Sequence, residues 1–226
     1  MPTVFNKSGR ASEVARLIID SRSIAWAGDE QSFTFTSGWK SPVYVNMRGV
    51  LGLPEFRTPL IEAAADFLAS EANLNAVDVI AGGETAGIPY AAMLADRLGK
   101  KFAYVRKAQK GFGMGRLIEG ADLAGQRALL VEDLTTDGKS KIAFVNTMRE
   151  AGAVVDEIFS CFYYGLRDAT AAIFEPAGLS LGYLCEWSDV LAEDRVGELL
   201  TSDQQQSLRQ FLVNPAQWAG PLTAGA

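Results

Sequence analysis

The apolar positions of this chain follow two periods, which alternate along its middle part. Apolar runs of the length of buried strands are separated by amphipathic segments with helical spacing. Five runs of the first kind lie at residues 77–83, 101–107, 127–133, 154–165 and 182–184. Strands that alternate with helices predict a parallel α/β sheet with right-handed crossovers. We therefore expect a mainly parallel five-stranded sheet flanked by helices.

Helical spacing marks the segments expected to cover this sheet. Residues 8–21 place apolar side chains on one face of a helix and offer Ser8 or Ser12 as a cap. Pro54 is suited to the first position of a second helix. Further helices are expected at residues 89–99, 141–152, 168–176 and 202–212, and a frayed tail at residues 215–226.

Residues 31–38 and 41–48 follow a third pattern, in which apolar and polar positions alternate. This period of two predicts a β-hairpin or two neighbouring antiparallel strands. The plain structural interpretation is a hairpin that only covers the core. The length of the chain favours one domain over two. We expect a single domain over residues 1–226, made of a small N-terminal hood (1–50), an α/β core (51–200) and a C-terminal helix and tail (201–226).

Composition narrows the class of protein. The 226 residues are 48% hydrophobic and 21% charged, as in an ordinary globular enzyme. No apolar run reaches the ~18 residues of a membrane span, and the first residues lack the apolar core of a signal peptide. We therefore expect a cytoplasmic protein with no membrane partner. Cys161 and Cys185 lie among apolar neighbours and are expected to be reduced core residues.

Histidine content and charge exclude further classes. The chain has no histidine, which removes every catalytic or metal site built on imidazole. Its formal charge of −6 argues against a nucleic-acid partner. The charge is unevenly distributed, because residues 97–118 carry seven basic side chains and no acidic one. This patch indicates an anionic ligand.

The segment from Arg127 to Ser140, RALLVEDLTTDGKS, joins a buried strand to polar chemistry. Glu132 and Asp133 stand where the strand should end, and a Thr-rich turn with Gly138 leads into a helix. Such a helix N-terminus, at the carboxyl end of a parallel strand, favours an anionic ligand. The turn also matches the phosphate-binding motif G-x-x-x-x-G-K-[ST], except that Asp133 replaces its first glycine. Because a carboxylate there would repel phosphate, the two acids are better suited to the hydroxyls of a ribose.

An apolar strand, two acids, a Thr-rich turn and a glycine before a helix resemble the signature of the phosphoribosyltransferases. The resemblance implies a type I phosphoribosyltransferase fold that binds phosphoribosyl pyrophosphate. On this chain it implies that Glu132 and Asp133 hold the ribose hydroxyls. It implies a cradle for the 5′-phosphate around Leu134, Thr135, Thr136, Asp137, Gly138, Lys139 and Ser140. Lys139 departs from the small residue usual in the family, and either adds a phosphate contact or points to solvent.

Three further segments resemble the orotate phosphoribosyltransferases in order and spacing. FTFTSGWKSPVYVN resembles the segment that holds the pyrimidine, and GGETAG, with Glu84 and Thr85, resembles the pyrophosphate loop. YVRKAQKGFGMGRLIEG resembles the mobile catalytic loop. An ordinary βα turn and a solvated basic loop are the plain alternatives for the last two. A hinged cationic lid accounts for glycines and basic residues together, and the resemblance implies donor contacts by Arg106, Lys107 and Lys110, with Lys107 and Lys110 as the catalytic pair.

The resemblance also implies a reaction and its partners. Ribose 5-phosphate would pass from phosphoribosyl pyrophosphate to orotate, with Mg²⁺ as the cofactor and no metal site made by protein side chains alone. Members of the family are homodimers whose mobile loop reaches the neighbouring site, so a homodimer is expected here. The implied contacts to orotate are Thr36, Tyr44, Val45, Thr136 and Arg167.

Three positions depart from the family pattern and leave the base open. Phe112 stands where the mobile loop usually has a histidine, and Thr36 stands where a basic contact to orotate is expected. The usual Asp-Arg pair after the fifth strand is missing, so Arg167 is the nearest substitute. Two alternatives remain, namely a phosphoribosyltransferase for another base and a non-catalytic regulator that binds phosphoribosyl pyrophosphate.

Overall fold

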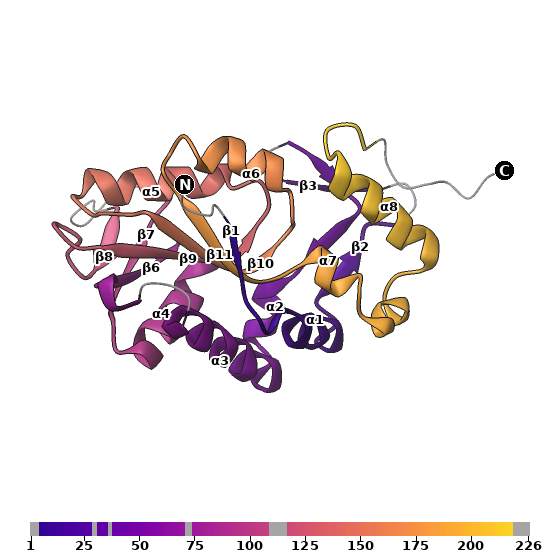
Figure 1. The fold of residues 1–226 in the computed structure, drawn as a ribbon, viewed down its shortest axis with the longest axis horizontal. Coiled ribbons are helices and arrows are strands. Elements are labelled where there is room, and N and C mark those ends of the chain that lie inside the picture. Colours follow the sequence, from indigo (N-terminus) through magenta and orange to yellow (C-terminus); the bar gives the residue numbers. More distant parts are fainter. Residues whose placement is uncertain (1–4, 29–30, 36–37, 71–73, 109–116, 219–226) are drawn as a thin grey trace.

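A seven-stranded sheet lies at the centre of the molecule, with helices on both faces (Figure 1). The computed structural model describes residues 5–28, 31–35, 38–70, 74–108 and 117–218. The strands of the sheet are β1 (Phe5–Lys7), β6 (Val79–Gly83), β7 (Lys101–Val105), β8 (Ile118–Gly120), β9 (Ala128–Thr135), β10 (Glu157–Tyr163) and β11 (Ser180–Glu186). Their order is β1-β11-β10-β9-β6-β7-β8, and only the pair β7 and β8 is antiparallel.

The mainly parallel α/β sheet expected from the sequence is confirmed, and the five predicted strands are β6, β7, β9, β10 and β11. The sheet is wider than predicted, because β1 and β8 extend its two edges. Each of these edge strands has only three residues, too few to display a period of two. The expectation of five strands therefore misses the two edges.

Eight α-helices are assigned in the described residues. They are α1 (Ala11–Asp20), α2 (Met47–Leu51), α3 (Pro54–Ser70), α4 (Gly87–Leu98), α5 (Lys139–Glu150), α6 (Arg167–Phe174), α7 (Trp187–Val190) and α8 (Ser202–Val213). The six predicted helices are present, whereas the short α2 and α7 were not predicted. Neither predicted cap starts α1, because its N-cap residue is Arg10 and Ser12 lies inside the helix. None of these helices is long and apolar enough to cross a membrane.

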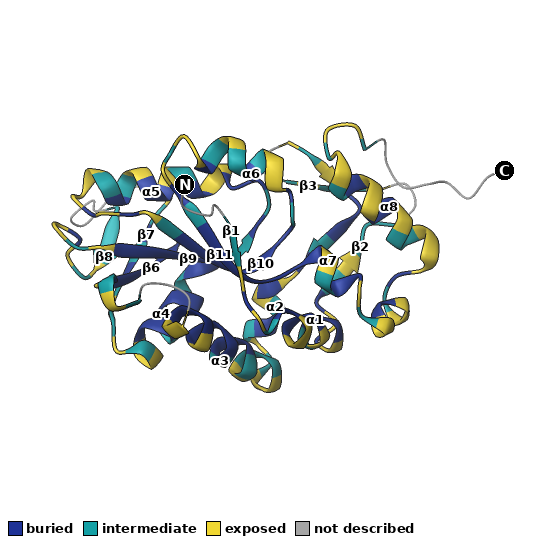
Figure 2. Cartoon of the chain, in the orientation of Figure 1, coloured by how far each residue is buried: buried dark blue, intermediate teal, exposed yellow. Residues whose placement is uncertain are grey.

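Both faces of the sheet are buried, as Figure 2 shows for its central strands. In β9, Leu129 and Val131 pack in the apolar layer that contains α3 and α4, whereas Leu130 packs in the layer of α5 and α6. This alternation explains why the sequence of the strand is almost continuously apolar. Cys161 and Cys185 are buried and free, which confirms their prediction as reduced core residues.

The hood contains two small antiparallel sheets. Its strands are β2 (Ile24–Trp26), β3 (Phe33–Thr34), β4 (Lys40–Ser41) and β5 (Val43–Val45). The strands β3 and β4 form the predicted antiparallel pair, but β5 pairs with β2, which was not predicted. Pro42 lies between β4 and β5 and has no N–H to donate, so the second predicted strand divides there. The hood lies beside the carboxyl end of β9, and α2 contacts that strand.

Candidate functional site

A cavity of about 240 Å³ opens where the hood faces the carboxyl ends of β6 and β9. The hood contributes Thr34, Phe35, Tyr44 and Arg48 to its lining. The sheet, its loops and the start of α5 contribute Glu84, Thr85, Ala86, Lys107, Glu132, Asp133, Leu134, Thr136, Ser140, Lys141 and Phe144. Segments about a hundred residues apart in sequence therefore meet at one edge of the sheet, where open α/β folds bind ligands.

The β9–α5 loop forms one wall of this cavity. Gly138 is the N-cap residue of α5 and has a φ of +87°, a conformation that side chains disfavour. A Cβ atom there would also lie 2.4 Å from the ring of Phe174. Because Gly138 has no side chain to cap the helix, Asp137 accepts the Lys139 N–H at 3.1 Å through Oδ1. The turn therefore holds the start of α5, with its free N–H groups, at the end of β9.

Glu132 is the more deeply buried of the two acids, with 4% of its surface exposed. Its Oε2 accepts a hydrogen bond from Lys141 Nζ at 3.0 Å. Oε1 is buried without a hydrogen-bond partner among the described residues, and a Cβ on Gly83 would lie only 2.0 Å from it. Burial raises the pKa of Glu132 to about 7, although the Lys141 ammonium acts in the opposite direction. Because a Cβ atom on residue 83 would overlap Oε1, only glycine leaves room there for the Glu132 carboxyl group.

Asp133 is 8% exposed and lines the cavity. Burial raises its pKa, while the positive charges of Lys141 and Arg48 lower it. These two cations reach the acid pair from opposite structural units, since Lys141 belongs to α5 and Arg48 belongs to α2 of the hood. The paired acids thus lie between a sheet-side and a hood-side cation.

The β6–α4 loop is held against Lys107, which lies in the basic segment at residues 97–118. The Glu84 carboxylate accepts the Lys107 N–H at 2.7 Å, and the Glu84 N–H donates to Val105 O at 2.9 Å. The Glu84–Thr85 peptide bond is cis. Both loop residues and Lys107 line the same cavity as the acid pair, which is the arrangement expected from the sequence.

Several predicted site residues lie elsewhere. Thr135 is the last residue of β9, is fully buried, and shares a hydrogen bond with the Ser160 hydroxyl. Val45 is buried in β5, and Arg106 lies near Glu119 at an N···O distance of 4.0 Å. Asp137, Gly138 and Lys139 form the turn beside the cavity without lining it, and Thr36, Lys110 and Phe112 lie outside the described residues.

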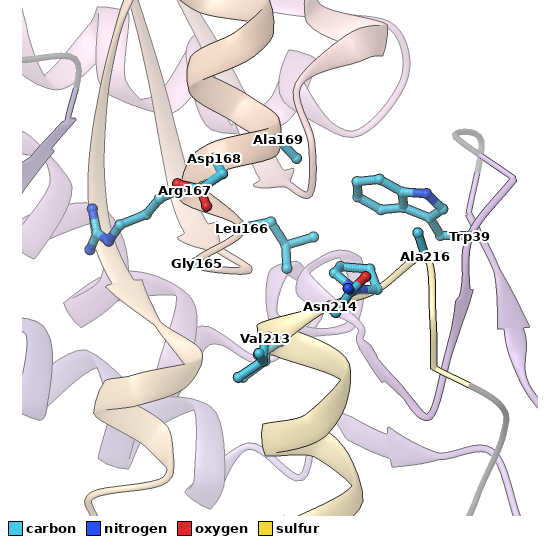
Figure 3. A pocket seen from close by; sticks show the side chains of 11 residues that line it. Trp39, Gly165, Leu166, Arg167, Asp168, Ala169, Val213, Asn214 and Ala216 are labelled. Atoms are coloured by element: carbon cyan, nitrogen blue, oxygen red, sulfur yellow. The ribbon is translucent and has the colours of Figure 1, made fainter.

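Arg167 does not line the cavity of the acid pair. Its guanidinium donates to Tyr183 Oη at 2.8 Å and to the Glu186 carboxylate at 2.9 Å. It also lies 5.2 Å from the centre of the Phe5 ring. Arg167 also helps to line a separate pocket together with Trp39 and the end of α8, and Figure 3 shows its guanidinium extending away from Trp39 and Asn214. The structure therefore gives Arg167 partners in the protein instead of a place in the site.

Two charged residues of the cavity lining were missed by sequence reasoning. Lys141 has the appearance of an ordinary helix residue, but its position three residues after Gly138 puts it on the first turn of α5, facing Glu132. Arg48 follows the alternating strand pattern directly, which hid the short helix α2. In the described residues, no group of three or more His, Cys, Asp or Glu side chains is arranged to hold a metal ion.

Comparison with known proteins gives the family. A profile described as a phosphoribosyl transferase domain matches residues 56–165. An orotate phosphoribosyltransferase of Cereibacter sphaeroides is 43% identical over 219 residues, which cover 96% of this chain and 94% of the relative. The chain belongs to the orotate phosphoribosyltransferase family. The orotate phosphoribosyltransferase of Agrobacterium fabrum is 40% identical over 217 residues, covering 96% of this chain and 93% of the relative.

Solved structures agree with this family and with the type I phosphoribosyltransferase fold. The orotate phosphoribosyltransferase of Aeropyrum pernix has a TM-score of 0.64 at 25% identity, covering 82% of this chain and 98% of that one. A Leishmania donovani UMP synthase has a TM-score of 0.76 at 24% identity and covers 91% of this chain, which spans 42% of that longer chain. Arg48 and Tyr44 precede the range matched by the domain profile, so the general phosphoribosyltransferase pattern does not include the hood side of the cavity.

Proposed function

We propose that this protein transfers ribose 5-phosphate from phosphoribosyl pyrophosphate to N1 of orotate, giving orotidine 5′-phosphate and pyrophosphate in pyrimidine biosynthesis. The observation that carries the proposal is a single cavity with two carboxylates at the end of β9 and aromatic side chains from the hood. Hydroxyl-binding acids suit a ribose, and Phe35 and Tyr44 suit a planar base. Membership of the orotate phosphoribosyltransferase family supports the same assignment.

In the proposed donor complex, Asp133 accepts hydrogen bonds from the ribose hydroxyls and Glu132 lies beside it. The 5′-phosphate lies at the start of α5, where free N–H groups favour an anion. The Thr136 and Ser140 side chains line that part of the cavity, with Leu134 between the acids and the turn. The turn is shaped by Asp137, Gly138 and Lys139. For Thr135 we propose a structural role, because its buried hydroxyl bonds to Ser160 on the neighbouring strand.

The chemical step makes mainly electrostatic demands on the protein. Departure of pyrophosphate leaves positive charge on the ribose and adds negative charge to the leaving group, so cations at the leaving group lower the barrier. We assign this task to Lys107 and Lys110, helped by Arg106, with Glu84 and Thr85 of the β6–α4 loop beside the pyrophosphate. Lys110 is also the proposed proton donor. The hydrogen bond from the Lys107 N–H to the Glu84 carboxylate supports a common pyrophosphate site, because it joins the β6–α4 loop to the basic segment at the cavity.

The proposed base site lies on the hood side. Tyr44 and Thr136 contact the pyrimidine, with the backbone near Val45 behind them. Thr36 is assigned to the same proposed site by sequence resemblance. Arg167 donates hydrogen bonds to Glu186, so the structure gives no support to its predicted contact with orotate.

The donor set of the cavity fits magnesium bound mainly through the substrate. Mg²⁺ prefers phosphate oxygens and water and takes few protein ligands. The described lining of the cavity contains the Glu132 and Asp133 carboxylates, at the proposed ribose position, and the Glu84 carboxylate, which accepts the Lys107 N–H. When bound, the ion would neutralise the pyrophosphate charge. The residues that would hold it near the ribose are the two acids.

We propose that residues 1–226 work as one phosphoribosyltransferase domain and as a homodimer, with the basic loop shared across subunits. We further propose a cytoplasmic location.

The direct test is an orotate-depletion assay with phosphoribosyl pyrophosphate and Mg²⁺, run beside uracil, hypoxanthine and adenine. We expect turnover of orotate with stoichiometric release of pyrophosphate. Turnover of another base in place of orotate would establish a different acceptor. Donor binding without pyrophosphate release from any base would identify a regulator instead of an enzyme.

A further inference from the structure

Arg48 is a cation of the cavity that has no assigned role. Its side chain is exposed and lines the cavity. Of the cavity's other described cations, Lys141 is bound to Glu132 at 3.0 Å and Lys107 lies on the basic segment beside Glu84. Among the described residues, the charge of Arg48 acts on the Asp133 carboxylate, and no side-chain hydrogen bond or ion pair of Arg48 is seen. It is therefore available to an anionic ligand from the hood side.

The backbone that carries Arg48 is firmly held. Asn46 caps α2 by accepting the Gly49 N–H at 3.1 Å. The Tyr90 hydroxyl of α4 donates to Met47 O at 2.6 Å, and the Met47 side chain is completely buried. These contacts fix the residues on either side of Arg48 while leaving its own side chain free. A long side chain on a fixed backbone is suited to a defined ligand contact.

The neighbours of Arg48 place it at the base end of the cavity. The other hood residues in the lining are Thr34, Phe35 and Tyr44, which carry aromatic rings or a hydroxyl group. Tyr44 packs against Phe33 with ring centres 5.6 Å apart, which holds one aromatic wall in place. The start of α5, where a phosphate would bind, belongs to the opposite wall. Arg48 is thus the hood-side cation of a wall that is otherwise suited to a planar base.

An acidic base needs such a cation. Orotate carries a carboxylate beside the nitrogen that reacts, and in this cavity it would approach Glu132 and Asp133, both of which are acids. Like charges at close range disfavour binding unless a cation lies between or beside them. A guanidinium matches a carboxylate with two parallel hydrogen bonds, which an ammonium cannot do. Among the described residues that line the cavity, Arg48 is the arginine.

We propose that Arg48 binds the carboxylate of the acceptor base and so selects an acidic pyrimidine over a neutral one. This inference rests on the proposed function and deepens it, because it names the residue that recognises the charge of orotate. It also accounts for a site in which Thr36 replaces the expected basic residue and Arg167 is bound to Glu186.

The test compares Arg48→Met with Arg48→Lys and with Arg97→Met. Arg97 is a matched control because it is an exposed arginine at the end of α4 and forms an ion pair with Glu62 at 3.0 Å. Steady-state constants are measured for orotate, for its neutral carboxamide and for phosphoribosyl pyrophosphate, and donor binding is measured by calorimetry. We expect Arg48→Met to raise the KM for orotate by at least ~10-fold, as for a lost hydrogen bond to a charged group.

The other readouts separate recognition from folding. Donor binding and the constants for the carboxamide should stay within ~2-fold of the unmodified protein, Arg48→Lys should recover part of the loss, and Arg97→Met should change nothing. An unchanged KM for orotate in Arg48→Met, or an equal loss for orotate and its carboxamide, would overturn the assignment of Arg48 alone. Absence of orotate turnover by the unmodified protein would overturn the proposed function and this inference with it.

Discussion

The donor side and the base side of the cavity are assembled in different ways. The part proposed to hold the ribose 5-phosphate comes from one continuous segment, in which β9, the turn at Gly138 and the first residues of α5 follow each other directly. The base side combines Phe35, Tyr44 and Arg48 of the hood with the edge of the sheet. A site made by one segment is visible as a motif, whereas a site made by several segments depends on how the hood packs against the core.

Lys110 tests the chemistry that links the two sides, and its loss should have the largest effect. We expect Lys110→Ala to lower kcat by at least ~10²-fold, the size of a lost transition-state charge contact, because a cation there stabilises the departing pyrophosphate. Rapid-quench or steady-state kinetics measure this, with Lys101→Ala as the control, since Lys101 bonds to Gln126 at the opposite end of β7. A variant with the kcat of the unmodified protein would remove the basic loop from the mechanism.

Glu132 tests the donor side through pH. The ordinary pKa of this group is 4.5, and burial raises it to about 7 in the folded protein. Between these values the folded state binds more protons than the unfolded state, so the contribution of Glu132 to stability falls as the pH rises. Glu132→Gln has no such proton to lose. Relative to the unmodified protein, its free energy of unfolding should therefore increase by ~2–3 kcal/mol across this window.

Urea unfolding of both proteins at pH 4.5 and just above pH 7 measures this difference. The comparison across pH removes the constant cost of the amide, including any effect on the buried Lys141. If the stability difference between the two proteins does not depend on pH, the pKa of Glu132 is not raised by folding. The attraction between Glu132 and Lys141 would then outweigh the cost of burying the charged carboxylate.

The sequence predicted the order of the core and the segment that carries the two acids. β9 and α5 have strong and different periods, so the turn between them and its acids could be placed before the structure was known. The sequence did not predict that Lys141 reaches back to Glu132, because this contact depends on the angle at which α5 leaves Gly138.

The base side was less predictable for a physical reason. The strands β2 to β5 have two or three residues each, and α2 has five, so none of them carries a recognisable period. Their positions follow from packing, such as the Tyr90 contact to Met47 O. Arg167 was predicted as the nearest substitute for the missing Asp-Arg pair after the fifth strand, whereas in the structure its side chain is bonded to Glu186.

The adjacent residues Thr135 and Thr136 test where the proposed phosphate site ends along β9. Thr135 is buried against Ser160, whereas Thr136 lines the cavity. Thr135→Val leaves the Ser160 hydroxyl without its partner, so we expect a loss of ~1–2 kcal/mol in the free energy of unfolding with nearly unchanged substrate constants. Thr136→Val should show the reverse pattern. Thermal unfolding and steady-state kinetics of the pair measure both, and weakened donor binding in Thr135→Val would return that residue to the phosphate cradle.

Arg167 tests the base side and should give the smallest effect. Its guanidinium is shared between Glu186 and Tyr183, and its side chain is 45% exposed, so Arg167→Met should cost at most ~1 kcal/mol of stability. The KM for orotate should stay within ~2-fold, in contrast to Arg48→Met, because the Arg167 side chain does not line the cavity of the acid pair. An orotate KM that rises as much as in Arg48→Met would mean that the loop before α6 rearranges when the base binds. The base side would then need two arginines, and the ion pair with Glu186 would be a resting position that orotate must break.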